Sequence, residues 1–150
     1  MRGKLKVAFS CYLLTLPLLM AFGLMYLFRP EFMPYHAVAV GRNWSEVDPG
    51  FQILILDLMK VAGGGLLATA CAMGILLFKP FRQGARWTYW AIPAIGWTLC
   101  LPLLYATVHV ARNTPASPPW MAIVLGILLL VAGFLFSMIP EAKTRQGQKD

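Results

Sequence analysis

Two residues of opposite charge stand within an otherwise apolar stretch of the chain and are the first candidates for chemistry. Asp57 and Lys60 are three residues apart, so on a helix their side chains come close enough to pair. Ionisable side chains within a membrane span usually face protein or a water-filled cavity, where they contact ions, protons or ligands. Near the end of a span, such a pair instead fixes helix depth and packing, since a lysine stem can reach the headgroups. The sequence leaves both alternatives open.

Three further residues could complete a polar site with this pair. Tyr105 and His109 are four residues apart and share one face of a helix, and His36 lies in a connecting segment. If the helix of Tyr105 packs against the helix of Asp57, we expect the five side chains to form a small-ligand site in the outer half of a bundle. No two histidine or glutamate side chains have the H-x-x-x-H or E-x-x-H spacing of metal-binding helices, so we predict no metal site. The sequence contains no recognisable catalytic group.

Four apolar stretches position these residues. The chain has 150 residues, of which 59% are hydrophobic and 13% charged. A helix needs about 20 residues to cross a hydrocarbon core of roughly 30 Å. The stretches of that length are residues 7–28, 49–78, 88–110 and 120–139. We therefore predict an all-α fold, a four-helix transmembrane bundle that forms a single domain over residues 1–150. The connection 29–50 is amphipathic, which predicts an outer loop on the membrane surface or folded over the bundle.

The basic residues predict how the helices are oriented. The net charge is +7, and most bases fall in the amino-terminal leader, the middle connection and the tail: Arg2, Lys4, Lys6, Lys79, Arg82, Arg86, Lys143, Arg145 and Lys149. Short segments rich in Lys and Arg stay cytoplasmic. We therefore expect a multi-pass protein of the bacterial cytoplasmic (inner) membrane with both termini in the cytoplasm. Its bases would contact anionic lipid headgroups, and the distribution predicts no nucleic-acid partner.

Small residues mark the faces expected to pack. Gly64, Ala68 and Ala72 recur every four residues, a spacing that lets helix backbones approach within a membrane. Since Asp57 and Lys60 share this side of the helix, we expect the charged pair to face inward. Gly126 and Gly133 are expected to serve the same packing role in the fourth helix.

A resemblance to a known family comes from the stretch LMKVAGGGLLATACAMGILLF. With Lys60, the glycines 63–65 and Gly74, it resembles the second helix of small, mostly uncharacterised bacterial membrane proteins of the DoxX-like type. The resemblance implies a four-helix layout over residues 7–139 and, for some relatives, a link to quinone or thiol redox complexes. The three cysteines form no C-x-x-C pair. The cysteine spacing therefore does not support the thiol chemistry of those relatives.

Three functions are compatible with these observations. The first is an accessory or partner-binding subunit, with another membrane protein or a second copy as partner, no catalytic activity and no cofactor. The alternative is a quinone-linked or other lipophilic-ligand-binding redox protein of the DoxX-like type, with the ligand near Asp57, Lys60, Tyr105 and His109. The third is a small transporter, for which no inverted repeat is visible in the sequence.

Overall fold

The computed structural model describes residues 3–139, which form four long helices and no strand. The long helices are α1 (Gly3–Phe28), α3 (Pro49–Leu76), α4 (Thr88–Asn113) and α5 (Trp120–Met138). All four are long and apolar enough to cross a membrane, which confirms the predicted all-α four-helix architecture. The connection between α1 and α3 contains a short helix, α2 (Pro34–Val40), and a 3₁₀ turn, η1 (Trp44–Glu46). Arg2 and the tail bases lie outside the described residues.

Local chemistry sets both ends of α3. The Gly50 backbone N–H donates to Asp48 Oδ1 at 2.8 Å, and Pro49, which has no N–H to satisfy, occupies the first helical position. At its other end α3 continues into a π-helical turn, η2 (Leu77–Phe81), which contains Pro80. Because Pro80 cannot donate to a preceding carbonyl, regular α-helix cannot continue there. Gly84, at φ +80°, then reverses the chain toward α4.

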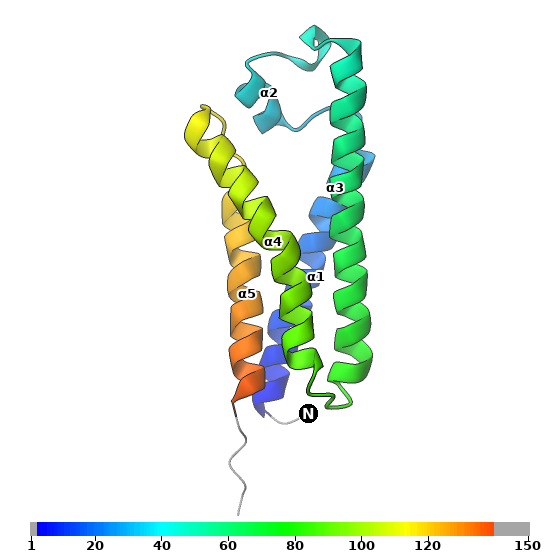
Figure 1. Ribbon diagram of the computed structural model, residues 1–150, viewed down its shortest axis with the longest axis vertical. Coiled ribbons are helices and arrows are strands. Elements are labelled where there is room, and N and C mark those ends of the chain that lie inside the picture. The colour runs from blue at the N-terminus through cyan, green and yellow to red at the C-terminus, as the bar shows by residue number, and fades with distance from the viewer. Residues whose placement is uncertain (1–2, 140–150) are drawn as a thin grey trace, which may run out of the picture.

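The helices pack unequally. Helix α1 packs mainly on α3 and α5, and α4 packs mainly on α5. The start of α1, the η2 turn and the end of α5 share one end of the bundle, here called the η2 end (Figure 1). The opposite end, the α2 end, carries α2, and there α3 and α4 spread apart (Figure 1). The bundle is therefore more open at its α2 end.

Most of the fully buried side chains of the core lie toward the η2 end. They include Tyr12, Met73, Leu77, Phe81 and Ile92. Tyr12 lies edge-on to the Phe81 ring, with ring centroids 5.7 Å apart, and its hydroxyl donates to the Tyr89 carbonyl at 3.2 Å. A Cβ on Gly133 would lie 2.5 Å from Tyr12 Cε1, so glycine makes room for this ring. The contact agrees with the packing role expected for Gly133.

The backbones of α1 and α3 come into close contact at Gly63, where a Cβ would lie 2.8 Å from the Gly23 carbonyl oxygen. The predicted stripe does not make this contact. A Cβ on Gly64 meets nothing within 4 Å, Ala68 is exposed and Ala72 is only half-buried. The packing prediction was therefore wrong by one residue, which turns a helix by about 100°. The backbone contact between Gly63 and Gly23 decides which face of α3 turns inward.

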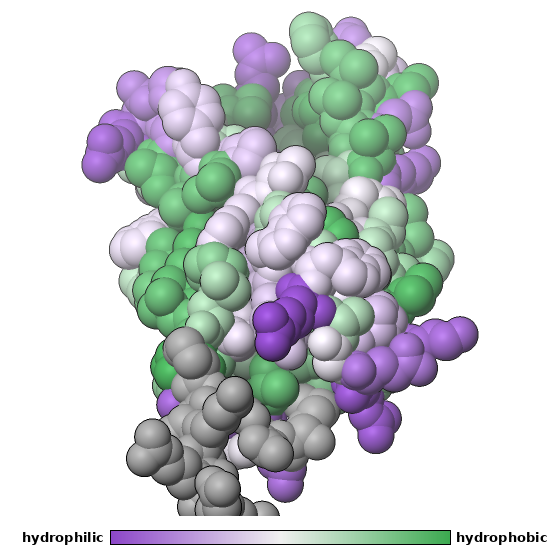
Figure 2. Space-filling model, turned by 60° about the horizontal axis from the view of Figure 1, so that its bottom comes forward, coloured by the Kyte–Doolittle hydropathy of each residue, from purple (hydrophilic) through white to green (hydrophobic). Residues whose placement is uncertain are grey.

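The flanks of the bundle are apolar. Figure 2 shows hydrophobic side chains along the sides of the molecule and hydrophilic side chains toward its ends. Leucines on α5 illustrate the exposure: Leu125, Leu128 and Leu135 are each at least half exposed. Such a surface suits acyl chains. The protein is accordingly a multi-pass helical membrane protein.

Candidate functional site

Asp57 and Lys60 pair with each other on the outside of the bundle. The Lys60 Nζ and Asp57 Oδ1 atoms are 3.3 Å apart, while the two side chains remain 55% and 64% exposed. The expectation that they face inward was wrong, because the buried face of α3 is the one formed by Met59, Gly63, Leu66, Ala70 and Met73. The ion pair is thus available to whatever covers the outer surface of α3.

Tyr105 and His109 also face outward, from the side of α4. The Tyr105 side chain is 72% exposed and its ring stacks on His109, with centroids 5.8 Å apart. His109 Nδ1 lies 3.3 Å from Asn113 Nδ2. Because α3 and α4 diverge toward the α2 end (Figure 1), no hydrogen bond within residues 3–139 connects these rings to Asp57 or Lys60. The structure therefore does not assemble the predicted five-residue site.

His36 belongs to a separate cluster on α2. Its ring centroid lies 4.3 Å from that of Tyr35 and 6.5 Å from that of Tyr26, and its Nδ1 accepts from the Met33 N–H at 3.4 Å. Burial lowers the pKa of His36 below its usual value of 6.5, because the charged ring loses hydration. The neutral ring therefore packs as one of several aromatic side chains at the α2 end.

The connection between α1 and α3 folds over the bundle, one of the two arrangements that its composition allowed. Phe32 and Met33 are buried against Met59 of α3. The Phe32 ring lies edge-on to Trp44, with centroids 4.9 Å apart, and Gln52 Nε2 donates to the Trp44 carbonyl at 2.7 Å. We call α2, η1 and the residues that join them, 29–48, the cap.

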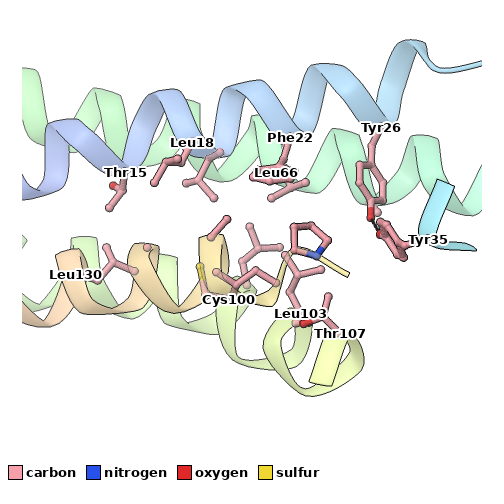
Figure 3. A pocket seen from close by; sticks show the side chains of 17 residues that line it. Thr15, Leu18, Phe22, Tyr26, Tyr35, Leu66, Cys100, Leu103, Thr107 and Leu130 are labelled. Carbon is pink, nitrogen blue, oxygen red and sulfur yellow. Dashed lines mark hydrogen bonds between the residues drawn. The ribbon is translucent and has the colours of Figure 1, made fainter. Parts of the chain in front are cut away.

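Beneath the cap the bundle encloses a pocket of about 120 Å³, partly open to the surroundings. All four long helices and α2 contribute to it. Its lining is almost entirely apolar, and Figure 3 labels ten of the residues: Thr15, Leu18, Phe22, Tyr26, Tyr35, Leu66, Cys100, Leu103, Thr107 and Leu130. The tyrosines lie together at one end of the pocket, and Thr15 and Leu130 lie toward the other (Figure 3). The pocket thus has an apolar body and one polar end.

At the polar end, the Tyr26 hydroxyl on α1 and the Tyr35 hydroxyl on α2 are hydrogen-bonded to each other (Figure 3). One hydroxyl of such a pair donates to the other, so the second O–H remains free to donate to a ligand. Burial, followed by the hydrogen bond with Tyr26, raises the pKa of Tyr35 well above its usual value. The Tyr35 hydroxyl therefore stays neutral across the physiological pH range.

The two threonines of the pocket offer only acceptors. Thr15 donates its hydroxyl proton to the Tyr12 carbonyl at 2.6 Å, and Thr107 donates to the Leu103 carbonyl at 2.9 Å. Each oxygen keeps lone-pair capacity, while its proton is already engaged. The tyrosine pair is thus the hydroxyl donor of the pocket, and most of the remaining lining favours hydrocarbon.

Sequence reasoning missed this pocket, and one of its residues was assigned the wrong role. Gly126 was expected to pack against a helix, but a Cβ there meets nothing within 4 Å, and the residue lines the pocket. The neighbouring helices leave open space beside Gly126, and this space is part of the pocket. One signal was available: Tyr26 and Tyr35 stand on either side of a short connection, which places both hydroxyls at the same end of helix α1.

The fold and the pocket together define a multi-pass four-helix membrane protein with an apolar pocket at one end. Within residues 3–139, no group of three or more His, Cys, Asp or Glu side chains lies close enough to hold a metal ion. The chain matches no protein-family model, no curated protein and no solved structure. The pocket and the surface of the bundle are therefore the features that bear on its function.

Proposed function

We propose that the protein binds a lipophilic molecule in the pocket beneath the cap. The observation that carries this proposal is an apolar cavity of about 120 Å³ with one free hydroxyl donor at its end. An engineered apolar cavity of about 150 Å³ in a soluble protein is large enough to bind benzene. A pocket of this size accordingly accepts one six-membered ring or a short chain segment, and any longer tail would leave through the open side.

The donor at the polar end indicates the chemical class of the ligand. A carbonyl oxygen accepts a hydrogen bond from the free hydroxyl of the Tyr26 and Tyr35 pair, and the rest of the molecule contacts Leu66, Leu103 and the other apolar side chains. Quinones and acyl lipids both carry a carbonyl next to hydrocarbon. A quinone-linked role of the DoxX-like kind is therefore supported by this chemistry, at residues other than those indicated by the sequence.

Competitive photolabelling tests the proposal. A phenyl-diazirine probe inserts into any apolar surface, but only insertion inside a pocket is reduced by a competitor. Ile123 lines the pocket, whereas Leu125, on the same helix, is half exposed on the flank. Acetophenone, a single-ring ketone, should reduce labelling at Ile123 at least fivefold and leave Leu125 unchanged. Equal, non-competable labelling at both residues would contradict the proposal.

The role of the hydroxyls is tested with a ligand pair that differs in one group. Acetophenone and ethylbenzene have similar size, but only the ketone accepts a hydrogen bond. Because either tyrosine alone keeps a free O–H, the double variant Tyr26→Phe/Tyr35→Phe is required. One neutral hydrogen bond contributes about 1 kcal/mol, so the double variant should lose roughly fivefold of its affinity for the ketone and none for ethylbenzene. An equal loss for both ligands would show that the hydroxyls only support packing.

We also propose a location and an orientation for the protein. The start of α1, the η2 turn and the end of α5 share one end of the bundle (Figure 1), and the leader and middle connection that adjoin this end are rich in bases. The positive-inside rule supports a cytoplasmic position for the η2 end in a bacterial inner membrane. Fusing a periplasm-active and a cytoplasm-active reporter in turn after residue 84 tests this orientation, and activity of the periplasmic one would contradict it.

A second candidate function, an accessory or partner-binding membrane subunit, is favoured by a different observation. The Asp57 and Lys60 side chains are more than half exposed on α3, although this helix lies among those that cross the membrane. Charged groups are costly against acyl chains, so protein contact would stabilise them. Cross-linking in native membranes, followed by mild solubilisation, tests this function, and a chain that remains alone under every condition would refute it.

A further inference from the structure

One face of α3 is left without a neighbour in the bundle. At 100° per residue, Ile53, Asp57, Lys60, Gly64 and Cys71 fall within about 60° of arc, and we call these five residues the α3 outer face. Ile53 is 65% exposed, both charged side chains are more than half exposed, and Cys71 is exposed. A Cβ on Gly64 meets nothing within 4 Å. The α3 outer face thus runs along most of the helix.

The order of exposed residues along α3, on this face and beside it, shows that neither lipid nor water alone suits the surface. Ile53 and the exposed Leu54 lie on one side of the charged pair along α3, and the exposed Val61 and Ile75 lie on the other side. If the membrane core extends along α3 as far as Ile53, Asp57 and Lys60 contact acyl chains. If the core ends between Lys60 and Val61, the side chains of Ile53 and Leu54 contact water. A protein surface that carries both charged and apolar side chains can contact the whole face favourably.

We propose that this surface is the α3 outer face of a second copy of the chain, related by a two-fold axis parallel to the helices. The inference names the partner for the second candidate function and does not depend on a ligand in the pocket. In a two-fold interface, a residue on one edge of the face meets the residue on the opposite edge of the partner. A face that pairs with itself must therefore carry complementary groups on its two edges.

The charged pair meets this condition. Asp57 and Lys60 are about 60° apart around α3, on opposite edges of the α3 outer face. The two-fold axis accordingly places Asp57 of each copy beside Lys60 of the other, with a rise of about 4.5 Å that a lysine side chain spans. The intrachain contact of 3.3 Å then becomes part of a network of four alternating charges. Each Asp57 carboxylate then lies beside the Lys60 ammonium groups of both copies, so no charge of the four is left unpaired.

Two residues at the centre of the face fit the same arrangement. Gly64 has no side chain to separate the helices, and small residues are what close packing of membrane helices requires. With helix axes about 8–10 Å apart, Cα atoms that face each other are about 3–5 Å apart, since each lies 2.3 Å from its axis. Cys71 of one copy then comes close enough to Cys71 of the other for a disulfide.

Oxidative cross-linking in native membranes tests the geometry. Copper phenanthroline should yield a covalent dimer through Cys71, and Cys71→Ala should abolish it although Cys11 and Cys100 remain. Gly64→Leu adds bulk at the centre of the face and should reduce the yield at least fivefold. Gly65→Leu is the matched control, because its Cβ also meets nothing within 4 Å but points about 110° away from the centre of the face. Equal effects of the two leucine variants, or cross-linking that survives Cys71→Ala, would overturn the proposal.

Charge complementation tests the ion pairs independently of the cysteine. Asp57→Lys makes both positions basic, and Lys60→Asp makes both acidic, so copies of either variant repel one another. Co-expression of the two variants with different tags should restore the dimer at least fivefold above either variant alone, which an intrachain pair would not predict. No association between wild-type copies in any membrane preparation, or association only with an unrelated chain, would refute the second copy as partner. Neither result would affect ligand labelling at Ile123.

Discussion

Replacing each of the consecutive glycines of α3 by alanine should separate a buried backbone contact from an exposed one. A Cβ on Gly63 would lie 2.8 Å from the Gly23 carbonyl oxygen and 2.9 Å from the Leu27 nitrogen, whereas a Cβ on Gly64 or Gly65 meets nothing within 4 Å. An ordinary contact begins near 3.4 Å, so Gly63→Ala must move α1 and α3 apart by 3.4 − 2.8 = 0.6 Å. The obstructing atoms belong to the backbone, so a rotamer change cannot relieve the overlap.

The size of the effect follows from two opposing contributions. All three alanine variants gain helix propensity of up to about 1 kcal/mol over glycine. Within a single chain, only Gly63→Ala also incurs the cost of overpacking, typically about 1–3 kcal/mol, so the variants are compared at dilutions where the chain is monomeric. The difference between Gly63→Ala and Gly64→Ala isolates the clash, and we expect the former to be less stable by about 1–3 kcal/mol.

Unfolding in mixed micelles measures this difference. Helicity is followed by circular dichroism while the mole fraction of SDS is raised, and the midpoints of the three variants are compared with the wild type. Gly63→Ala should unfold at a lower SDS fraction, and Gly64→Ala and Gly65→Ala at or above the wild-type fraction. If Gly64→Ala were as destabilising as Gly63→Ala, the assignment of the inward face of α3 would be wrong.

Three further predictions concern the core, the start of α3 and the cap. Tyr12→Phe removes the hydrogen bond to the Tyr89 carbonyl and should lower stability by about 1 kcal/mol in the same SDS titration; an unchanged midpoint would contradict the bond. Asp48→Ala removes the acceptor for the Gly50 N–H and should cost about 1 kcal/mol, seen as faster amide exchange in the first turn of α3 but not in α4. Burial lowers the pKa of His36, so an open cap binds protons more readily than a closed one. The closed cap should therefore be fully stable above about pH 6.5 and lose stability as the pH falls below it, measured by amide exchange of α2 corrected for intrinsic rates; His36→Gln should remove this dependence.

The helices themselves followed directly from composition. Apolar length was enough to predict four membrane helices, and the predicted stretch 49–78 begins where α3 begins, at Pro49. These features are local, since a cap or a long apolar run has the same meaning whatever packs against it. They did not depend on knowing how one helix is rotated against another.

Rotation about the helix axis was the part that the sequence could not decide. Three glycines in a row allow close contact through Gly63, Gly64 or Gly65, and the choice depends on whether Gly23 of α1 lies opposite. The charged pair favoured the face of Gly64, because charges in a membrane were expected to turn inward. The same rotation moved the candidate site: with the predicted polar faces of α3 and α4 turned outward, the pocket formed among apolar side chains and the tyrosines of α1 and α2.

The pocket beneath the cap is tested most directly by filling it. A leucine at residue 126 enters the open space next to Gly126, while Gly65→Leu makes the same chemical change outside the pocket. The affinity of the purified protein for acetophenone should fall at least tenfold in Gly126→Leu and stay within twofold of the wild type in Gly65→Leu, with both variants as helical as the wild type. Equal affinities for all three proteins would contradict binding in this pocket.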